Sequence, residues 1–215
     1  MKRTALLWPI LLLTPVILGF CLLLGASGLG LPDWHDPAGR AIFGLRLTRV
    51  AAGFVIGAGL SCAGVVMQAL LRNPLAEPYV LGVSSGAGLG AALAILTGLG
   101  AAGVLTLPVS AFAFACVTLI LVYALGSEGG KPSIYGLILS GVIVSSVCSS
   151  LLMFMISVAP MEGLHSILWW MLGDLQVPSL PLLTACSILA AVGFVAIWLL
   201  APELNALTLG TEMAH

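Results

Sequence analysis

Five stretches of this chain contain no acidic or basic side chain, and their lengths restrict the fold more than any other feature. They cover residues 4–32, 50–71, 78–127, 132–161 and 175–202. An α-helix needs about 20 apolar residues to cross a bilayer. The third stretch has 50 residues, enough for two crossings joined by a turn near residues 99–103. The sequence therefore predicts six membrane-spanning helices, near residues 5–26, 48–71, 79–99, 104–125, 134–158 and 180–201.

The composition excludes the other broad classes of protein. Hydrophobic residues make up 60% of the chain and charged residues only 7%, whereas an ordinary soluble domain has about 25% charged residues. Disordered chains are polar and rich in charge. Seven basic side chains against eight acidic ones leave no basic face for a nucleic acid. The apolar stretches are too continuous for the alternating strands of a membrane barrel. The predicted fold class is all-α, a polytopic transmembrane helical bundle, with residues 1–215 in a single transmembrane domain.

The first apolar stretch follows Lys2 and Arg3, as the apolar core of a cleavable signal peptide also does. Such a core has about 7–15 residues. Here it runs from Ala5 to Leu24, which favours an uncleaved membrane anchor. With a cytoplasmic N-terminus, four basic residues face inward and three face outward, so the positive-inside rule gives only weak support. Six crossings then return the C-terminus to the cytoplasm.

No residue pattern indicates an enzyme, a resident metal or a bound nucleotide. The five cysteines lie in different predicted helices without a Cys-x-x-Cys pair, and free cysteine is commonly a small buried apolar residue. The three histidines lie far apart, unlike the ligand cluster of a zinc site. The Gly-Lys-Ser/Thr ending of a phosphate loop does not occur. The sequence predicts no catalytic residue, no metal site and no cofactor of its own, with any ATP used by a partner.

Glycines recur every fourth position in two predicted helices. Gly53 and Gly57 form one pair, and Gly82, Gly86 and Gly90 form a longer row. This spacing places glycines on one helix face, where a neighbouring backbone can approach closely. We therefore expect both sets to be helix-packing positions.

Five serines occur within eleven residues of the predicted helix 134–158, in pairs four residues apart along one side. They are Ser140, Ser145, Ser146, Ser149 and Ser150. A serine in a lipid-buried helix can simply bond its own backbone. A row of hydroxyls can equally line a water-filled path. Both interpretations stay open, and the predicted translocation path consists of Ser145, Ser146, Ser149 and Ser150.

Several segments together resemble one family of membrane proteins. They are LRLTR (45–49), GAGLSCAGVVMQ (57–68), RNPLAEP (72–78), LGVSSGAG (81–88), LILSG (137–141), ILWWMLG (167–173) and LNALTLGTEMA (204–214). The resemblance is to the permeases of ABC importers for iron–siderophore complexes, haem and cobalamin, the FecCD/BtuC type. It spans about residues 40–215, and the RNPLAEP–GVSSGAG block is its most specific part.

The resemblance implies a transport subunit of the bacterial cytoplasmic (inner) membrane. Such a permease has ten helices and pairs with a second permease subunit, identical or different. Two cytoplasmic ATPase subunits hydrolyse ATP, and an extracytoplasmic binding protein delivers the cargo. The chain ends after its sixth predicted helix, so we expect a permease truncated at its C-terminal end, either a fragment or a natural product. Iron–siderophore is the favoured cargo because it is the commonest in the family.

The resemblance also implies roles for particular residues. Arg46 and Arg49 match a pair of arginines that dock the binding protein, although Thr48 replaces the usual proline between them. Ile134 and Tyr135 fall where the cytoplasmic gate lies. The ATPase-coupling segment begins at Thr211, Glu212, Met213 and Ala214.

Two other functions stay open. One is a non-transporting remnant or assembly partner of such a permease. The other is an intramembrane serine hydrolase, suggested by Gly25-Ala26-Ser27-Gly28 and Ser84-Ser85-Gly86. A hydrolase needs a histidine beside its serine, and none of the three histidines lies in a predicted helix.

Overall fold

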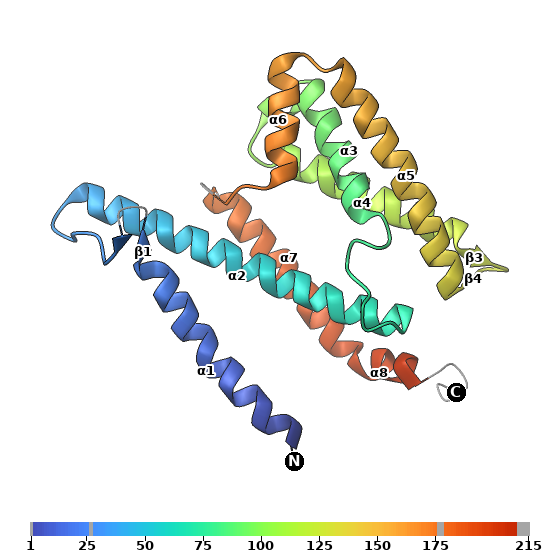
Figure 1. The fold of residues 1–215 in the computed structure, drawn as a ribbon, viewed down its shortest axis with the longest axis horizontal. Coiled ribbons are helices and arrows are strands. Elements are labelled where there is room, and N and C mark those ends of the chain that lie inside the picture. Colours follow the sequence, from blue (N-terminus) through green and yellow to red (C-terminus); the bar gives the residue numbers. More distant parts are fainter. Residues whose placement is uncertain (1, 26–27, 176–178, 210–215) are drawn as a thin grey trace. The chain divides into compact units, whose positions relative to one another are not determined.

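The structure is a computed structural model that describes residues 2–25, 28–175 and 179–209. Most of them are helical (Figure 1), which confirms the all-α fold class. The helices are α1 (Lys2–Leu23), α2 (Pro37–Leu71), α3 (Val83–Leu96), α4 (Thr106–Leu125), α5 (Ile134–Val158), α6 (Met161–Leu172), α7 (Leu180–Leu199) and α8 (Ala201–Leu209), with a 3-10 turn, η1 (Leu99–Ala102). Two short hairpins connect helices: β1 (Leu24–Gly25) with β2 (Gly28–Leu29), and β3 (Ser127–Glu128) with β4 (Lys131–Pro132).

Four helices in the described part of the chain, α2, α4, α5 and α7, are long and apolar enough to cross a membrane. α3 is shorter than the predicted 79–99, because Gly82 and Gly98 take left-handed backbone angles at its two ends. Its 14 residues span about 21 Å, less than the roughly 30 Å of a bilayer's apolar core. The helical part of α3 is therefore shorter than the apolar core of a bilayer, and the other residues of the predicted segment 79–99 lie in turns at its two ends.

α2 begins at Pro37, well before the predicted start near residue 48. The Asp36 side chain accepts a hydrogen bond from the backbone N–H of Ala38 at 3.0 Å. An aspartate before a proline in the first helical position is a strong helix start. Charge ends an apolar stretch without ending a helix, because arginine is a good helix former. Arg46 and Arg49 consequently lie inside α2 instead of at its entry.

Two short helices, α6 and α8, were not predicted. α6 has 12 residues and α8 has 9, so neither meets the 20-residue criterion for a crossing. The hairpin β3–β4 turns at Gly129 and Gly130, with φ of 60° and 80°. A Gly-Gly pair is typical of such two-residue turns, so this element was detectable in the sequence.

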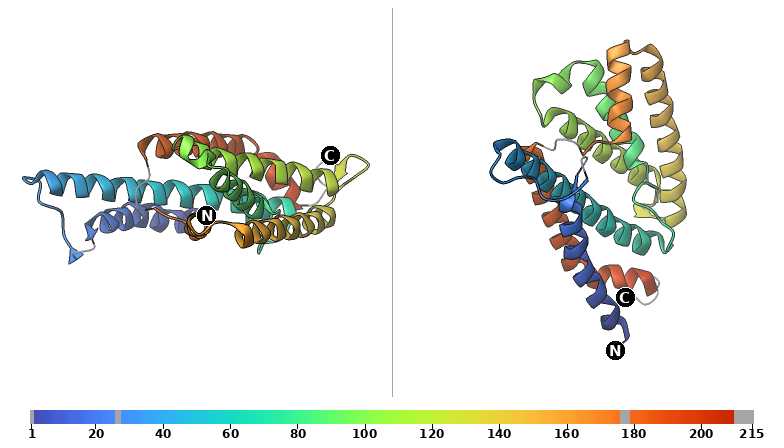
Figure 2. Two further views of the ribbon diagram at one scale, coloured as in Figure 1. Left: turned by 90° about the horizontal axis from the view of Figure 1, so that it is seen from above. Right: turned by 60° about the vertical axis from the view of Figure 1, so that its left-hand side comes forward.

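The chain divides into two compact units, each described separately below. One contains Met1–Gly57 with Leu175–Ser187, and the other contains Ala58–Asp174 with Ile188–His215. In the second unit, α3 packs against α4, α5 and α6 (Figures 1 and 2). The core there comprises Leu81, Leu89, Ala92, Val122, Leu137, Val144, Cys148, Leu152 and Ile167.

The glycines of α3 allow α4 to approach closely. A Cβ built on Gly86 would lie 2.0 Å from Thr118 Oγ1, and one on Gly90 would lie 2.6 Å from Phe114 Cβ. Across the same seam, Ser110 Oγ donates to the Gly90 carbonyl at 2.8 Å. No side chain larger than hydrogen fits these two positions without displacing α4.

The other predicted packing glycines behave differently. Gly82 faces α5, where an added Cβ would lie 2.7 Å from Ser145 Oγ. At Gly53 and Gly57 an added Cβ would meet no atom within 4 Å. Their role in helix packing stays a prediction.

Candidate functional site

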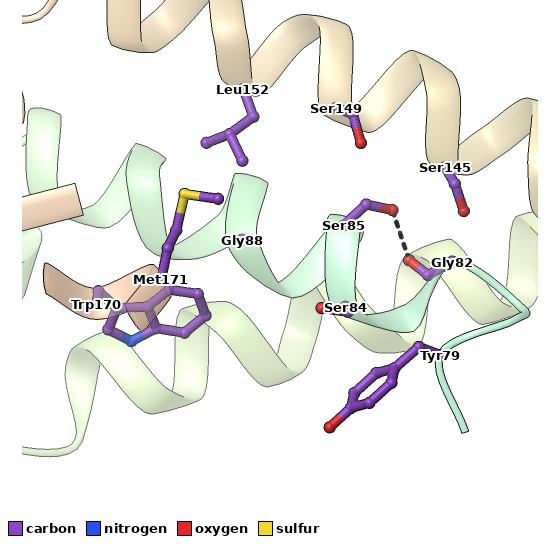
Figure 3. A pocket seen from close by; sticks show the side chains of 10 residues that line it. All are labelled: Tyr79, Gly82, Ser84, Ser85, Gly88, Ser145, Ser149, Leu152, Trp170 and Met171. Atoms are coloured by element: carbon purple, nitrogen blue, oxygen red, sulfur yellow. Dashed lines mark hydrogen bonds between the residues drawn. The ribbon is translucent and has the colours of Figure 1, made fainter. Parts of the chain in front are cut away.

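A cavity of about 340 Å³ opens between α3, α5 and α6 in the second unit (Figure 3). The first turn of α3 forms one wall, and Ser145, Ser149 and Leu152 project from α5 opposite it. The lining residues are Tyr79, Gly82, Ser84, Ser85, Gly88, Ser145, Ser149, Leu152, Trp170 and Met171. Hydroxyls from two helices therefore meet in one cavity.

The lining combines hydroxyls with apolar groups and contains no charged residue. Four serines and a tyrosine supply hydroxyls, and none of the lining residues is Asp, Glu, Lys, Arg or His. Ser85 Oγ donates to the Gly82 carbonyl at 2.9 Å. Such hydroxyls give weak, reversible hydrogen bonds as donors and as acceptors. The cavity is suited to contact with a passing neutral or shielded molecule.

The serines of α5 divide into groups with different surroundings. Ser145 and Ser149 line the cavity. Ser146 and Ser150 are exposed outside it, and each donates to the carbonyl four residues earlier at 2.8 Å. Successive helix residues point about 100° apart, so the two pairs occupy neighbouring faces. The structure therefore brings Ser145 and Ser149 to the cavity, and the place of Ser146 and Ser150 in a path stays a prediction.

Ser140 forms a hydrogen bond between two helices. Its side chain is 5% exposed, and its Oγ donates to the carbonyl of Val122 in α4 at 2.9 Å. It also bonds the Leu137 carbonyl of its own helix at 3.2 Å. This hydroxyl joins α5 to α4 and does not line the cavity.

The arginines expected to dock a binding protein differ in their surroundings. Arg46 Nη1 donates to the carbonyls of Leu22 at 3.2 Å and Gly30 at 2.8 Å. Arg49, one turn further along α2, is exposed. The structure therefore assigns Arg46 contacts inside the chain that sequence reasoning did not foresee.

The two residues expected to form the gate, Ile134 and Tyr135, begin α5. Ser133 precedes the helix, and its Oγ accepts a hydrogen bond from the Gly136 N–H at 3.0 Å, which caps the helix. Ile134 is half-buried and Tyr135 is 87% exposed. The residues expected to begin the ATPase-coupling segment, Thr211–Ala214, lie outside the described residues.

The hydrolase interpretation gains no support from the cavity. Ser84 and Ser85 both line it, but no histidine does. The Nε2 of His165, on α6, accepts a hydrogen bond from the Trp169 indole instead. Ser27 lies outside the described residues.

Sequence reasoning missed Tyr79, Leu152, Trp170 and Met171 as lining residues. Trp170 and Met171 belong to α6, a helix that was not predicted, so their position beside α5 was not visible. Tyr79 directly follows the RNPLAEP turn and precedes a helix start rich in glycine and serine. This position between two motifs of the family was a sequence feature that could have identified it.

Comparisons with known proteins place these features in a family. The FecCD transport family model matches residues 11–215. The vitamin B12 import system permease protein BtuC of Shigella boydii serotype 18 is 35% identical over 165 residues, covering 76% of this chain and 49% of that protein. BtuC of Escherichia coli O139:H28 is 34% identical with the same coverage.

A solved structure gives the same result at the level of the fold. It is described as an inward-facing conformation of an ABC transporter of the metal-chelate type. The TM-score is 0.86 with 30% identity, over 98% of this chain and 67% of the solved chain. The chain spans about half the length of the curated relatives that it matches. On the family match and the shared fold, this protein belongs to the FecCD transport family.

Proposed function

We propose that the chain supplies membrane-spanning helices to the permease of an ATP-driven importer of the FecCD/BtuC type. The observation that carries this proposal is the family match over residues 11–215. The chain is then a multi-pass protein of the bacterial cytoplasmic membrane, with both termini on the cytoplasmic side. It contributes no ATPase activity of its own.

The hydroxyl-lined cavity supports a role beside the translocation path. Ser145 and Ser149 present neutral groups opposite Ser84 and Ser85. A path of weak, uncharged contacts allows a molecule to enter and to leave, whereas a strong site would retain it. Ser146 and Ser150 belong to the path only if another helix or subunit forms a water-filled space on their side of α5.

The proposed cargo is a bulky metal chelate. Iron–siderophore is one candidate, and vitamin B12 is the other, because the two related permeases are named for its import. At about 340 Å³ the cavity is near the lower limit for drug-sized ligands, so it contacts one edge of such a chelate and does not enclose it.

The proposed partners are a second permease subunit, two cytoplasmic ATPase subunits and an extracytoplasmic binding protein. Arg49 and the surrounding surface of α2 would meet acidic groups of the binding protein, since arginine binds carboxylates through two parallel hydrogen bonds. Ile134 and Tyr135 would form the cytoplasmic gate, and Thr211–Ala214 would begin the ATPase contact.

Reconstituted transport tests this proposal. The chain is purified with its partner subunits in proteoliposomes, and ATP-dependent uptake of a labelled ferric siderophore and of labelled cobalamin is measured. We expect saturable uptake of one of them that stops when the ATPase is inactivated. A complete, ATP-hydrolysing complex without uptake of either chelate would favour the alternative of a non-transporting assembly partner.

A further inference from the structure

α2 is longer than a membrane crossing requires. Its 35 residues extend about 52 Å, compared with roughly 30 Å for the apolar core of a bilayer. All three of its charged residues, Arg40, Arg46 and Arg49, lie in its first 13 positions, and residues 50–71 carry none. The charge-free part alone is long enough to cross. The first turns of α2 are therefore available to hold a structure at the membrane edge.

The segment between the first two helices lies against this start of α2 (Figure 1). We call residues 24–25 and 28–36 the α1–α2 connection. Arg46 joins its two sides, because Nη1 donates both to Leu22 at the end of α1 and to Gly30 after the hairpin. In addition, the Gly30 N–H donates to the Leu23 carbonyl at 2.9 Å.

The Leu22 carbonyl is in the last turn of α1, where carbonyls have no partner within the helix. A guanidinium there satisfies one of these carbonyls and places positive charge at the negative end of the helix dipole. Hydrogen bonds from a charged donor are shorter and stronger than neutral ones. The Arg46 side chain thus caps α1 and also holds the backbone at Gly30, directly after β2.

The neighbouring backbone leaves space for this side chain. A Cβ built on Gly25 would lie 1.9 Å from Arg46 Nη2, so only glycine leaves the guanidinium in place. On the far side of the connection, a Cβ on Gly39 would lie 1.9 Å from the Asp33 carbonyl oxygen. The connection is therefore closely packed on α2 at both places.

We propose that Arg46 is a positioning residue that locks the α1–α2 connection onto α2. Arg46 then affects capture of a binding protein through the shape of the connection, in addition to any contact that its other guanidinium N–H groups make. The lock is a property of this chain alone, so it operates without cargo, ATPase or binding protein.

Hydrogen exchange on the full chain in lipid nanodiscs, with no other protein present, tests the lock. In Arg46→Gln we expect the Gly30 amide to exchange about tenfold faster or more, because charge-assisted hydrogen bonds to its segment are lost. Arg40→Gln is the matched control, since it removes the same charge from the same helix at an exposed position, and exchange should stay unchanged. A residue that only docks a partner would show no change in either variant, and that result would overturn the proposal. So would equal acceleration in both.

A second variant keeps the test valid if Arg46→Gln does not fold. Gly25→Ala retains every native side chain but requires the tip of the guanidinium to shift, so it should accelerate exchange of the Gly30 amide by a smaller factor than complete loss of the donor would. Gly19→Ala is its control, because a Cβ there meets no atom within 4 Å. Protection at Gly30 that survives Gly25→Ala in a correctly inserted chain would contradict the lock.

Discussion

The α3–α6 bundle and the α1–α2 connection are held together by different interactions. In the bundle, α3 has seven buried residues, and its glycines admit the backbone and side chains of α4. In the connection, the longest-range contacts are polar and depend on a single guanidinium. Packing that is shared among many atoms is sensitive to added volume, whereas a polar lock is sensitive to loss of one donor.

The largest effect should follow an increase in volume at the α3–α4 seam. Gly86→Leu places a side chain where even a Cβ would lie 2.0 Å from Thr118 Oγ1. Overpacking a tight core costs about 1–3 kcal/mol or more, so the thermal midpoint in detergent should fall clearly or the protein should fail to express. Gly44→Leu, in α2, is the matched control, because a Cβ built on Gly44 would meet no atom within 4 Å. If both substitutions lower the thermal midpoint equally, the α3–α4 seam is no more sensitive to added volume than α2 is.

A smaller loss is expected from one buried hydroxyl in the bundle. Ser140→Ala removes the hydrogen bond to the Val122 carbonyl. That carbonyl still accepts from the Gly126 N–H at 2.8 Å, so the cost should be the net value of one hydrogen bond, up to about 1.5 kcal/mol. Ser146→Ala, whose bond is local and exposed, should change the unfolding midpoint very little. If the two variants unfold at the same denaturant concentration, the Ser140 contact does not stabilise the bundle.

The smallest effect should be confined to the start of α2. Asp36→Ala removes the cap from the Ala38 N–H, which costs a helix about 1 kcal/mol. The loss should appear as faster hydrogen exchange in the first turn of α2, with the thermal midpoint of the bundle unchanged. If the thermal midpoint falls while exchange at Ala38 is unchanged, Asp36 stabilises the protein by a contact other than this cap.

The same contrast explains what the sequence could predict. α5 was predicted at 134–158, which is where it lies, because polar residues bound one continuous apolar stretch. α2 was predicted too short, since charge marks the end of the apolar part and not of the helix. The α3 glycine spacing correctly indicated close packing, but α4 as the partner of Gly86 and Gly90 required the fold.

The site was predictable only where local pattern determines it. The i, i+4 spacing of Ser145 and Ser149 indicated a shared face, but the spacing of Ser146 and Ser150 is identical. Which pair faces α3 depends on how α5 packs, and a single sequence does not encode that in its spacing. Arg46 contacts Leu22, which is 24 positions away in the chain, and Gly30, which is 16 positions away. No local sequence pattern predicts contacts over such separations.

Thiol labelling at α5 tests the central claim, that the cavity face borders the translocation path. Ser149→Cys and Ser150→Cys are compared with a membrane-impermeant reagent, in the assembled transporter with its five native cysteines replaced. We predict that Ser149→Cys reacts at least tenfold faster, because charged reagents need water to reach a thiol and react with its thiolate. Chelate delivered by the binding protein should slow that reaction. Faster labelling of Ser150→Cys, or labelling of Ser149→Cys that is insensitive to cargo, would contradict the account.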